Sequence, residues 1–102
     1  MGNYIDHSVE HLSFAIAETQ TIPIDSTHSA LVSFLDISAP AVVLLDISIG
    51  AIQVWRGWIS TTPVQLNFGL GRGSGIVNED ITVIASGQSE VFVGIRKVEK
   101  TF

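Results

Sequence analysis

The sequence predicts an all-β protein, built as a single antiparallel β-sandwich of about seven to eight strands. Segments rich in Val, Ile, Leu and Phe recur about every ten residues, and Gly, Pro, Asn and Ser mark the turns between them. No segment keeps the period of an amphipathic helix. The 102 residues suffice for one core and are too few for two. A jelly roll is the favoured topology. The pattern does not separate it from an immunoglobulin-like sandwich, although the missing Cys and Trp signature disfavours that alternative.

The N-terminal part is predicted to hold an arm and the first strand. Residues 1–11 are polar and irregular in pattern, so we expect an arm there and a β-sandwich domain over residues 12–102. Alternation over residues 12–17 predicts the first strand, which residues 18–20 end. Residues 21–25 are extended but contain a proline, which places them at a sheet edge or a strand end.

Two similar strands are predicted next, over residues 30–37 and 42–49. Both are rich in Val, Ile, Leu or Phe. The tetrapeptide Leu-Asp-Ile-Ser occurs at the end of each, at residues 35–38 and 45–48. A connection with a proline separates them, as expected of a turn. The shared tetrapeptide is too short for a repeat architecture, whose periods begin near about 20 residues, so we attribute it to common β-rich composition.

Residues 49–60 contain both tryptophans and the first positive charge of the chain. With a period of two, Trp55 and Ile59 share one face while Val54 and Arg56 share the other. Both faces are therefore expected to be partly covered. The pattern predicts a central strand and not a sheet edge.

Three more strands are predicted in the second half. Residues 64–70 give the cleanest alternation of apolar and polar side chains, typical of a half-buried strand. Residues 69–75 alternate glycine with other residues and are expected to form a long flexible loop. Strands over residues 81–86 and 90–98 follow, joined by the short turn of residues 87–89.

Charge is scarce and unevenly distributed along the chain. Charged residues make up 15%, against roughly 25% in average soluble domains, so we expect part of the surface to be covered by copies of the chain or by a partner. Residues 1–55 hold six acidic and no Lys or Arg side chains, and all five basic residues follow. A mixed surface is the simpler expectation, because the halves of a sandwich interleave, and head-to-tail contact between acidic and basic patches is the alternative.

Composition also limits the partners and the compartment. A pI of about 4.8 and five scattered basic residues argue against a nucleic-acid partner. The chain has no cysteine, which excludes disulfides and thiolate metal sites. The first ten residues lack the features of a signal peptide, and the longest apolar run, residues 39–45, is far too short to span a bilayer. We therefore expect no membrane partner and a protein that is not secreted.

No constellation of residues predicts catalysis. The stretch from His7 to His11 fits the H-x-x-E-H metalloprotease pattern, with Glu10 as the acid, but that site requires a helix and a third ligand. Neither is expected in a polar arm. The chain also lacks a G-x-S-x-G motif, and its carboxylates are scattered singly. The sequence thus predicts no catalytic residue, no cofactor and no metal.

Four residues are candidates for contacts with a partner: Trp55, Trp58, Arg72 and Arg96. The tryptophans are three apart on a strand, so they point to opposite faces and form no flat platform for a sugar; we expect Trp55 in the core and Trp58 at an interface or rim. Arg72, in the predicted glycine loop, could pair with a carboxylate of a neighbour. Arg96 lies in the basic end of the last strand, where charge also protects an edge against aggregation.

The second half resembles small virion proteins of tailed bacteriophages. The similarity lies in the order of four segments: a strand after a short glycine turn, an alternating strand that runs into a glycine-rich loop, a strand introduced by an acidic pair, and the last strand. The segments cover residues 50–59, 64–71, 79–86 and 91–95. The resemblance is a pattern over about half of the chain, and it carries no catalytic residue.

The resemblance implies a jelly-roll-like capsid decoration (cement) protein, a head-fibre base or a tail accessory protein, present in many copies and often trimeric. We therefore expect a non-enzymatic virion protein that is assembled in the host cytoplasm. Its partners would be the major capsid protein, or another virion protein, and its own copies, with a trimer favoured. The alternative is a carbohydrate- or receptor-binding module of a fibre or tail that uses Trp55 or Trp58.

Overall fold

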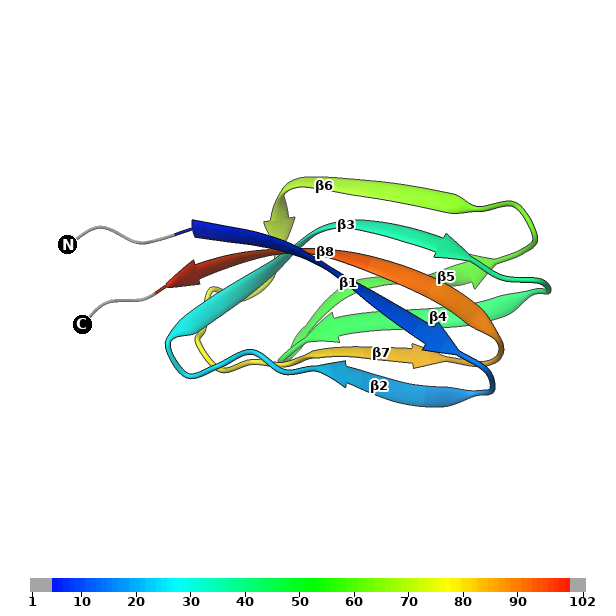
Figure 1. Cartoon of the computed structure of the whole chain (residues 1–102), viewed down its shortest axis with the longest axis horizontal. Coiled ribbons are helices and arrows are strands. Elements are labelled where there is room, and N and C mark those ends of the chain that lie inside the picture. The colour runs from blue at the N-terminus through cyan, green and yellow to red at the C-terminus, as the bar shows by residue number, and fades with distance from the viewer. Residues whose placement is uncertain (1–4, 100–102) are drawn as a thin grey trace.

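A computed structural model describes residues 5–99 of the chain. It holds eight antiparallel strands in two four-stranded sheets that pack face to face (Figure 1). The all-β sandwich predicted from the sequence is therefore confirmed. The strands are β1 (Ile5–Phe14), β2 (Glu18–Ile22), β3 (His28–Ser38), β4 (Val43–Ile49), β5 (Ile52–Ile59), β6 (Val64–Arg72), β7 (Ile81–Ala85) and β8 (Ser89–Glu99).

The strand order identifies the topology. Sheet A has the order β1-β8-β3-β6, and sheet B has the order β2-β7-β4-β5. The hydrogen-bonded pairs β1·β8, β2·β7, β3·β6 and β4·β5 nest like the two arms of one long hairpin that has been folded over itself. This nesting is the jelly roll, so the favoured topology is also confirmed.

The core lies between the sheets and follows from the alternation of side chains along each strand. On β4 the burial alternates strictly: Val43, Leu45, Ile47 and Ile49 point inward and are buried. β3, β7 and β8 contribute in the same way, with Leu35, Val83 and Val93 among the fully buried side chains. Neither sheet could cover its apolar face alone, so this packing holds the two layers together.

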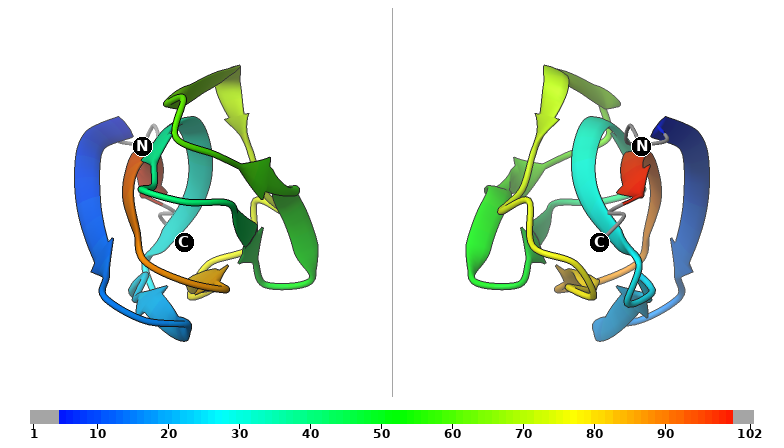
Figure 2. Two further views of the ribbon diagram at one scale, coloured as in Figure 1. Left: turned by 90° about the vertical axis from the view of Figure 1, so that its right-hand side faces the viewer. Right: turned by 90° about the vertical axis from the view of Figure 1, so that its left-hand side faces the viewer.

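The molecule is elongated, with extents of 48 × 22 × 19 Å. β1, β8 and the first part of β3 run beyond the strands of sheet B, and the two layers are seen along the long axis in Figure 2. The turn before β3 lies at this extended end. His28 and Thr27 hydrogen-bond to the Asp25 carboxylate and lower its pKa to about 2, with the His28 bond of 2.7 Å as the larger cause.

The expected N-terminal arm differs most from the structure. Residues 5–11 belong to β1, which pairs with β8 in unbroken register from Ile5↔Val98 to Phe14↔Ser89. Residues 1–4 lie outside the described part of the chain. β1 is an edge strand whose first half runs past sheet B, so it needs few apolar side chains and its sequence lacks a clear alternation.

Three other element predictions need correction. The strand with the two tryptophans, β5, is the edge of sheet B and not a central strand. Residues 18–20, expected to end the first strand, begin β2, while residues 15–17 form the bend between them. The first half of the expected glycine loop belongs to β6, where Gly69 and Gly71 have φ angles of 68° and 119° in an irregular stretch of four residues, 68–71, opposite Ser33 of β3.

Candidate functional site

The two tryptophans lie on opposite faces of β5, as their spacing predicted. The side chain of Trp58 is 68% exposed on the outer face of sheet B. Trp55 points inward, packs against the core and lays its ring over Gly57, where an added Cβ would lie 2.6 Å from Cζ2. A bulge at Val54, between the pairs Ile47↔Trp55 and Ser48↔Gln53, turns both Val54 and Trp55 inward. Together the two rings form no sugar-stacking platform.

Trp58 is the most exposed residue of an apolar patch on the outer face of sheet B. It lies directly opposite Leu44 on β4, and Ile84 on β7 lies diagonally across from Leu44. Val42 precedes β4 and is also exposed. We call these four residues the Trp58 patch. Their only charged neighbours in the facing positions of β4 and β5 are Asp46 and Arg56, which pair with each other at 3.5 Å.

Arg72 connects the edges of the two sheets. Its Nη1 donates a 2.8 Å hydrogen bond to the carbonyl of Val54, and its guanidinium carbon lies 4.5 Å from the centroid of the Phe68 ring. Val54 is the extra residue of the β5 bulge, and a bulge leaves one residue unpaired in the ladder. Arg72 therefore satisfies a backbone carbonyl within its own chain. Its contact with a neighbouring molecule stays a prediction.

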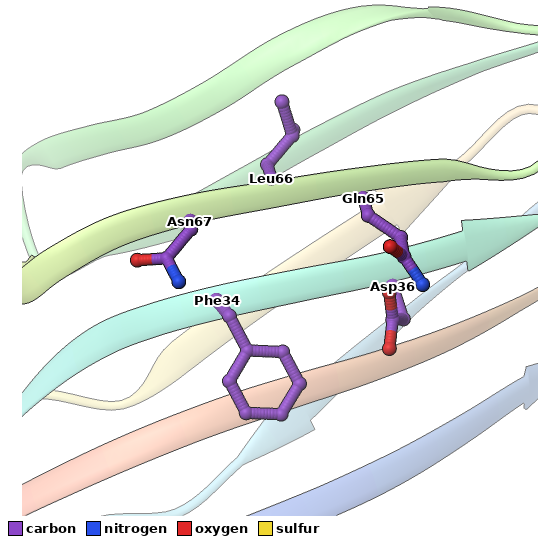
Figure 3. Close-up of a pocket in the computed structure, with 5 residues that line it drawn as sticks. All are labelled: Phe34, Asp36, Gln65, Leu66 and Asn67. Carbon is purple, nitrogen blue, oxygen red and sulfur yellow. The ribbon is translucent and has the colours of Figure 1, made fainter.

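The outer face of sheet A differs from that of sheet B: it is hollowed, whereas Trp58 protrudes from sheet B. One hollow, of about 380 Å³, is lined by Phe34, Asp36, Gln65, Leu66 and Asn67 (Figure 3). A second, of about 260 Å³, lies beside it and is lined by Phe92 and Pro63 among others. Asp36 and Gln65 line both, so the two hollows form one trough, which we call the sheet A trough. Arg96 lies on the same face, between His7 and Leu31.

A hydrogen-bonded group adjoins the sheet A trough through Phe92. The rings of His11 and Phe92 are stacked with their centroids 4.3 Å apart and an angle of 5° between them. Ser13 Oγ donates to Glu90 at 2.6 Å, and His11 Nε2 donates to the other oxygen of Glu90 at 2.8 Å. The Ser13 bond and then the His11 bond hold the pKa of the Glu90 carboxyl below its usual value.

The H-x-x-E-H stretch does not form the helical metal site that its pattern requires. Because the H-x-x-E-H stretch is in β1, its two histidines are four strand residues, or about 13 Å, apart. Among residues 5–99, no group of three or more His, Cys, Asp or Glu side chains could hold a metal ion. Ser13 and His11 both bond to Glu90, so this group is not a relay in which a histidine activates a serine. No helix within the described residues is long and apolar enough to cross a membrane.

The sequence indicated that Trp58 is exposed, but it did not reveal the other residues of the Trp58 patch or the sheet A trough. The sheet A trough brings together residues from three strands, about 30 positions apart in sequence, through the register Phe92↔Asp36↔Gln65. No local motif marks such a row. The one usable signal was Phe34 two residues before Asp36 on a strand, which places an aromatic ring and a carboxylate on the same face.

Comparisons with known proteins leave the function open. No known protein family matches the sequence, and no curated protein matches it. Among solved structures, a Bacillus endospore appendage, from a family of disulfide-linked pili, has 11% identity and a TM-score of 0.49 over 98% of this chain and 90% of that one. A structure of infectious bursal disease virus, Gt strain, has 11% identity and a TM-score of 0.28 over 92% of this chain and 32% of that one. Neither likeness is close enough to carry an argument about function.

Proposed function

We propose that this protein is a non-enzymatic structural subunit that works in a many-copy assembly and is held there through the Trp58 patch. The observation that carries the proposal is a tryptophan that is 68% exposed on the edge strand β5, beside the other apolar side chains of the patch on the outer face of sheet B. Contiguous exposed apolar patches mark interaction sites, and tryptophan is enriched among the residues that dominate binding energy.

The surroundings of the Trp58 patch favour a flat protein partner. The β2 and β7 residues beside it include Thr19, Thr21 and Thr82, which are uncharged and lose little when they are desolvated at the rim of an interface. The chain is also poor in charge as a whole, with 15% charged residues. A partner that covers this face would remove the apolar surface from water, at about 25 cal/mol per Å².

The finer proposal is a capsid decoration protein of a tailed phage. It is supported by the sequence pattern of residues 50–95 and is compatible with the jelly roll, a fold used by many viral capsid proteins. The partners would then be the major capsid protein and further copies of the chain, with a trimer favoured, and assembly would take place in the host cytoplasm. A head-fibre or tail component would use the same patch.

Substitution of Trp58 tests the proposal. Trp58→Ser is expected to raise the protein concentration at which the assembly dissociates into monomers by at least tenfold. Light scattering after size-exclusion chromatography, over a dilution series, measures this concentration. If the partner is a phage capsid, the same variant will fail to bind expanded heads that lack the protein. Ile16→Ser is the matched control, because Ile16 is 67% exposed in the bend after β1 and belongs to neither sheet. Equal behaviour of the two variants contradicts the proposal.

A further inference from the structure

The floor of the sheet A trough carries an aromatic ring that lies flat on the sheet. Phe34 on β3 is paired with Gly94 on β8, and a Cβ at Gly94 would overlap the Phe34 ring. The absence of a side chain at this buried position therefore lets the ring lie across the neighbouring strand (Figure 3). A ring held flat in this way turns one face to the solvent, where it can stack on a planar apolar surface.

A second ring bounds the trough on the other side. Phe92 is 40% exposed, and the stacked ring of His11 supports it from β1. The hydrogen bond from His11 to Glu90 fixes the orientation of that support. The trough thus offers one aromatic ring in each of its two hollows, with Asp36 and Gln65 between them.

The polar side chains between the rings have hydrogen-bonding capacity to spare. Among the described residues, neither the Asp36 carboxylate nor the Gln65 amide takes part in a side-chain hydrogen bond or an ion pair, and Asn67 uses only its Oδ1, which accepts a bond from the amide of Gly69. These three groups can together accept several hydrogen bonds and donate from two amide nitrogens. They face the same open space as the rings.

The combination selects the chemistry of a ligand. An apolar protein surface would bury the Asp36 carboxylate without a partner, at a cost of several kcal/mol. A phosphate or a sulfated ligand would meet the negative charge of Asp36, which lines both hollows. A sugar ring has apolar C–H faces that can stack on Phe34 and Phe92, and it has hydroxyl groups that can donate to a carboxylate and exchange bonds with amides.

We propose that the sheet A trough binds a neutral carbohydrate, with one sugar ring stacked on Phe34, a second on Phe92, and Asp36 hydrogen-bonded to hydroxyl groups of both. The two hollows, of about 380 and 260 Å³, adjoin each other and together are of the size of a small-ligand site, so the ligand is at least a disaccharide. This function is independent of the Trp58 patch, which lies on the opposite sheet.

The test uses the full chain on an array of neutral, acidic and basic oligosaccharides, followed by calorimetric titration with the neutral oligosaccharide that binds best. We expect binding to neutral oligosaccharides and a loss of about tenfold in affinity for Asp36→Asn, which keeps the shape and removes the charge of the acceptor. Phe92→Ala should lower affinity by a similar factor. Trp58→Ser is the control and should bind sugar unchanged.

Amide chemical shifts recorded during the titration should move at Phe34, Asp36 and Gln65 and stay constant around Trp58. Denaturant unfolding of each variant separates a loss of binding from a loss of fold. The proposal is overturned if no neutral oligosaccharide binds at millimolar concentration, if sulfated or cationic ligands bind instead, or if Asp36→Asn and Phe92→Ala both bind like the unsubstituted protein. If these two variants change the oligomeric state instead, the trough is a contact between copies and the proposal is also wrong.

Discussion

The outer faces of the two sheets differ although both belong to four-stranded antiparallel sheets of one jelly roll. Sheet A is hollowed, because Gly94 lets Phe34 lie flat and a row of polar side chains separates two aromatic rings. Sheet B carries a raised tryptophan opposite a leucine and few charged neighbours. A hollow with free hydrogen-bonding groups suits a small polar ligand, whereas a raised apolar patch suits a protein surface.

The comparison shows that the fold leaves the two outer faces free to differ. Alternation ties every second side chain to the core, and those positions are apolar in both sheets. The remaining positions are constrained only by their cross-strand neighbours. A single position such as Gly94 or Trp58 can therefore decide whether a face is hollow or raised, and substitutions at these positions should affect one face without the other.

The largest effect is expected for Gly94→Ala. The new methyl group would overlap the Phe34 ring, so the ring must leave the sheet or the strands must shift, which should lower the free energy of unfolding by about 1–3 kcal/mol and abolish sugar binding. Urea unfolding and the calorimetric titration measure the two effects. Oligomerisation through the Trp58 patch should persist.

Gly87→Ala is the matched control for Gly94→Ala. A Cβ at Gly87 would meet Val43 Cγ2 at 3.6 Å, an ordinary contact, so this variant should stay close to the original stability. Equal stability of the two variants would mean that Phe34 is not held by the missing side chain of Gly94. The difference between the faces would then need another cause.

A smaller effect is expected for Arg72, which links the edges of the two sheets. Arg72→Ala removes the hydrogen bond to the Val54 carbonyl and the contact with Phe68. The free energy of unfolding should therefore fall by about 1–2 kcal/mol. Arg56→Ala is the control, because its ion pair with Asp46 is largely exposed and should contribute less than about 1 kcal/mol. If both variants unfold alike, Arg72 does not hold the edges together.

The sequence predicts the fold well because strand composition and alternation are local signals. The strands over residues 30–37, 42–49 and 64–70 were found almost at their observed bounds, the first two from their runs of Val, Ile, Leu and Phe and the third from its alternation. Edge strands are less visible. Residues 5–11 of β1 were taken for an arm, because this part of the strand runs past sheet B and needs few apolar side chains. β5 was taken for a central strand, because the bulge at Val54 shifts its period and turns both Val54 and Trp55 inward.

The candidate sites were less predictable because they depend on register between strands. The exposure of Trp58 followed from its spacing to Trp55, which is local information. By contrast, the row of Phe92, Asp36 and Gln65 exists only once three distant strands are paired, and a shift by one residue would turn each of them to the other face. The role of Arg72 was hidden for the same reason, since its partner is a backbone carbonyl on another sheet.

The smallest effect concerns the ionisation of Glu90 beside the sheet A trough. Its pKa is depressed mainly by the hydrogen bond from Ser13, so Ser13→Ala should raise the pKa of Glu90 toward its ordinary value. A depressed carboxyl pKa stabilises the fold above the pKa of the unfolded chain, about 4.3, and this contribution is lost as the pH falls through the folded value. Carboxyl carbon NMR over a pH titration measures the change directly. Ser60→Ala, at an exposed position after β5, should leave the pKa of Glu90 unaltered, and an unaltered value in Ser13→Ala as well would show that the Ser13 bond does not hold the carboxylate.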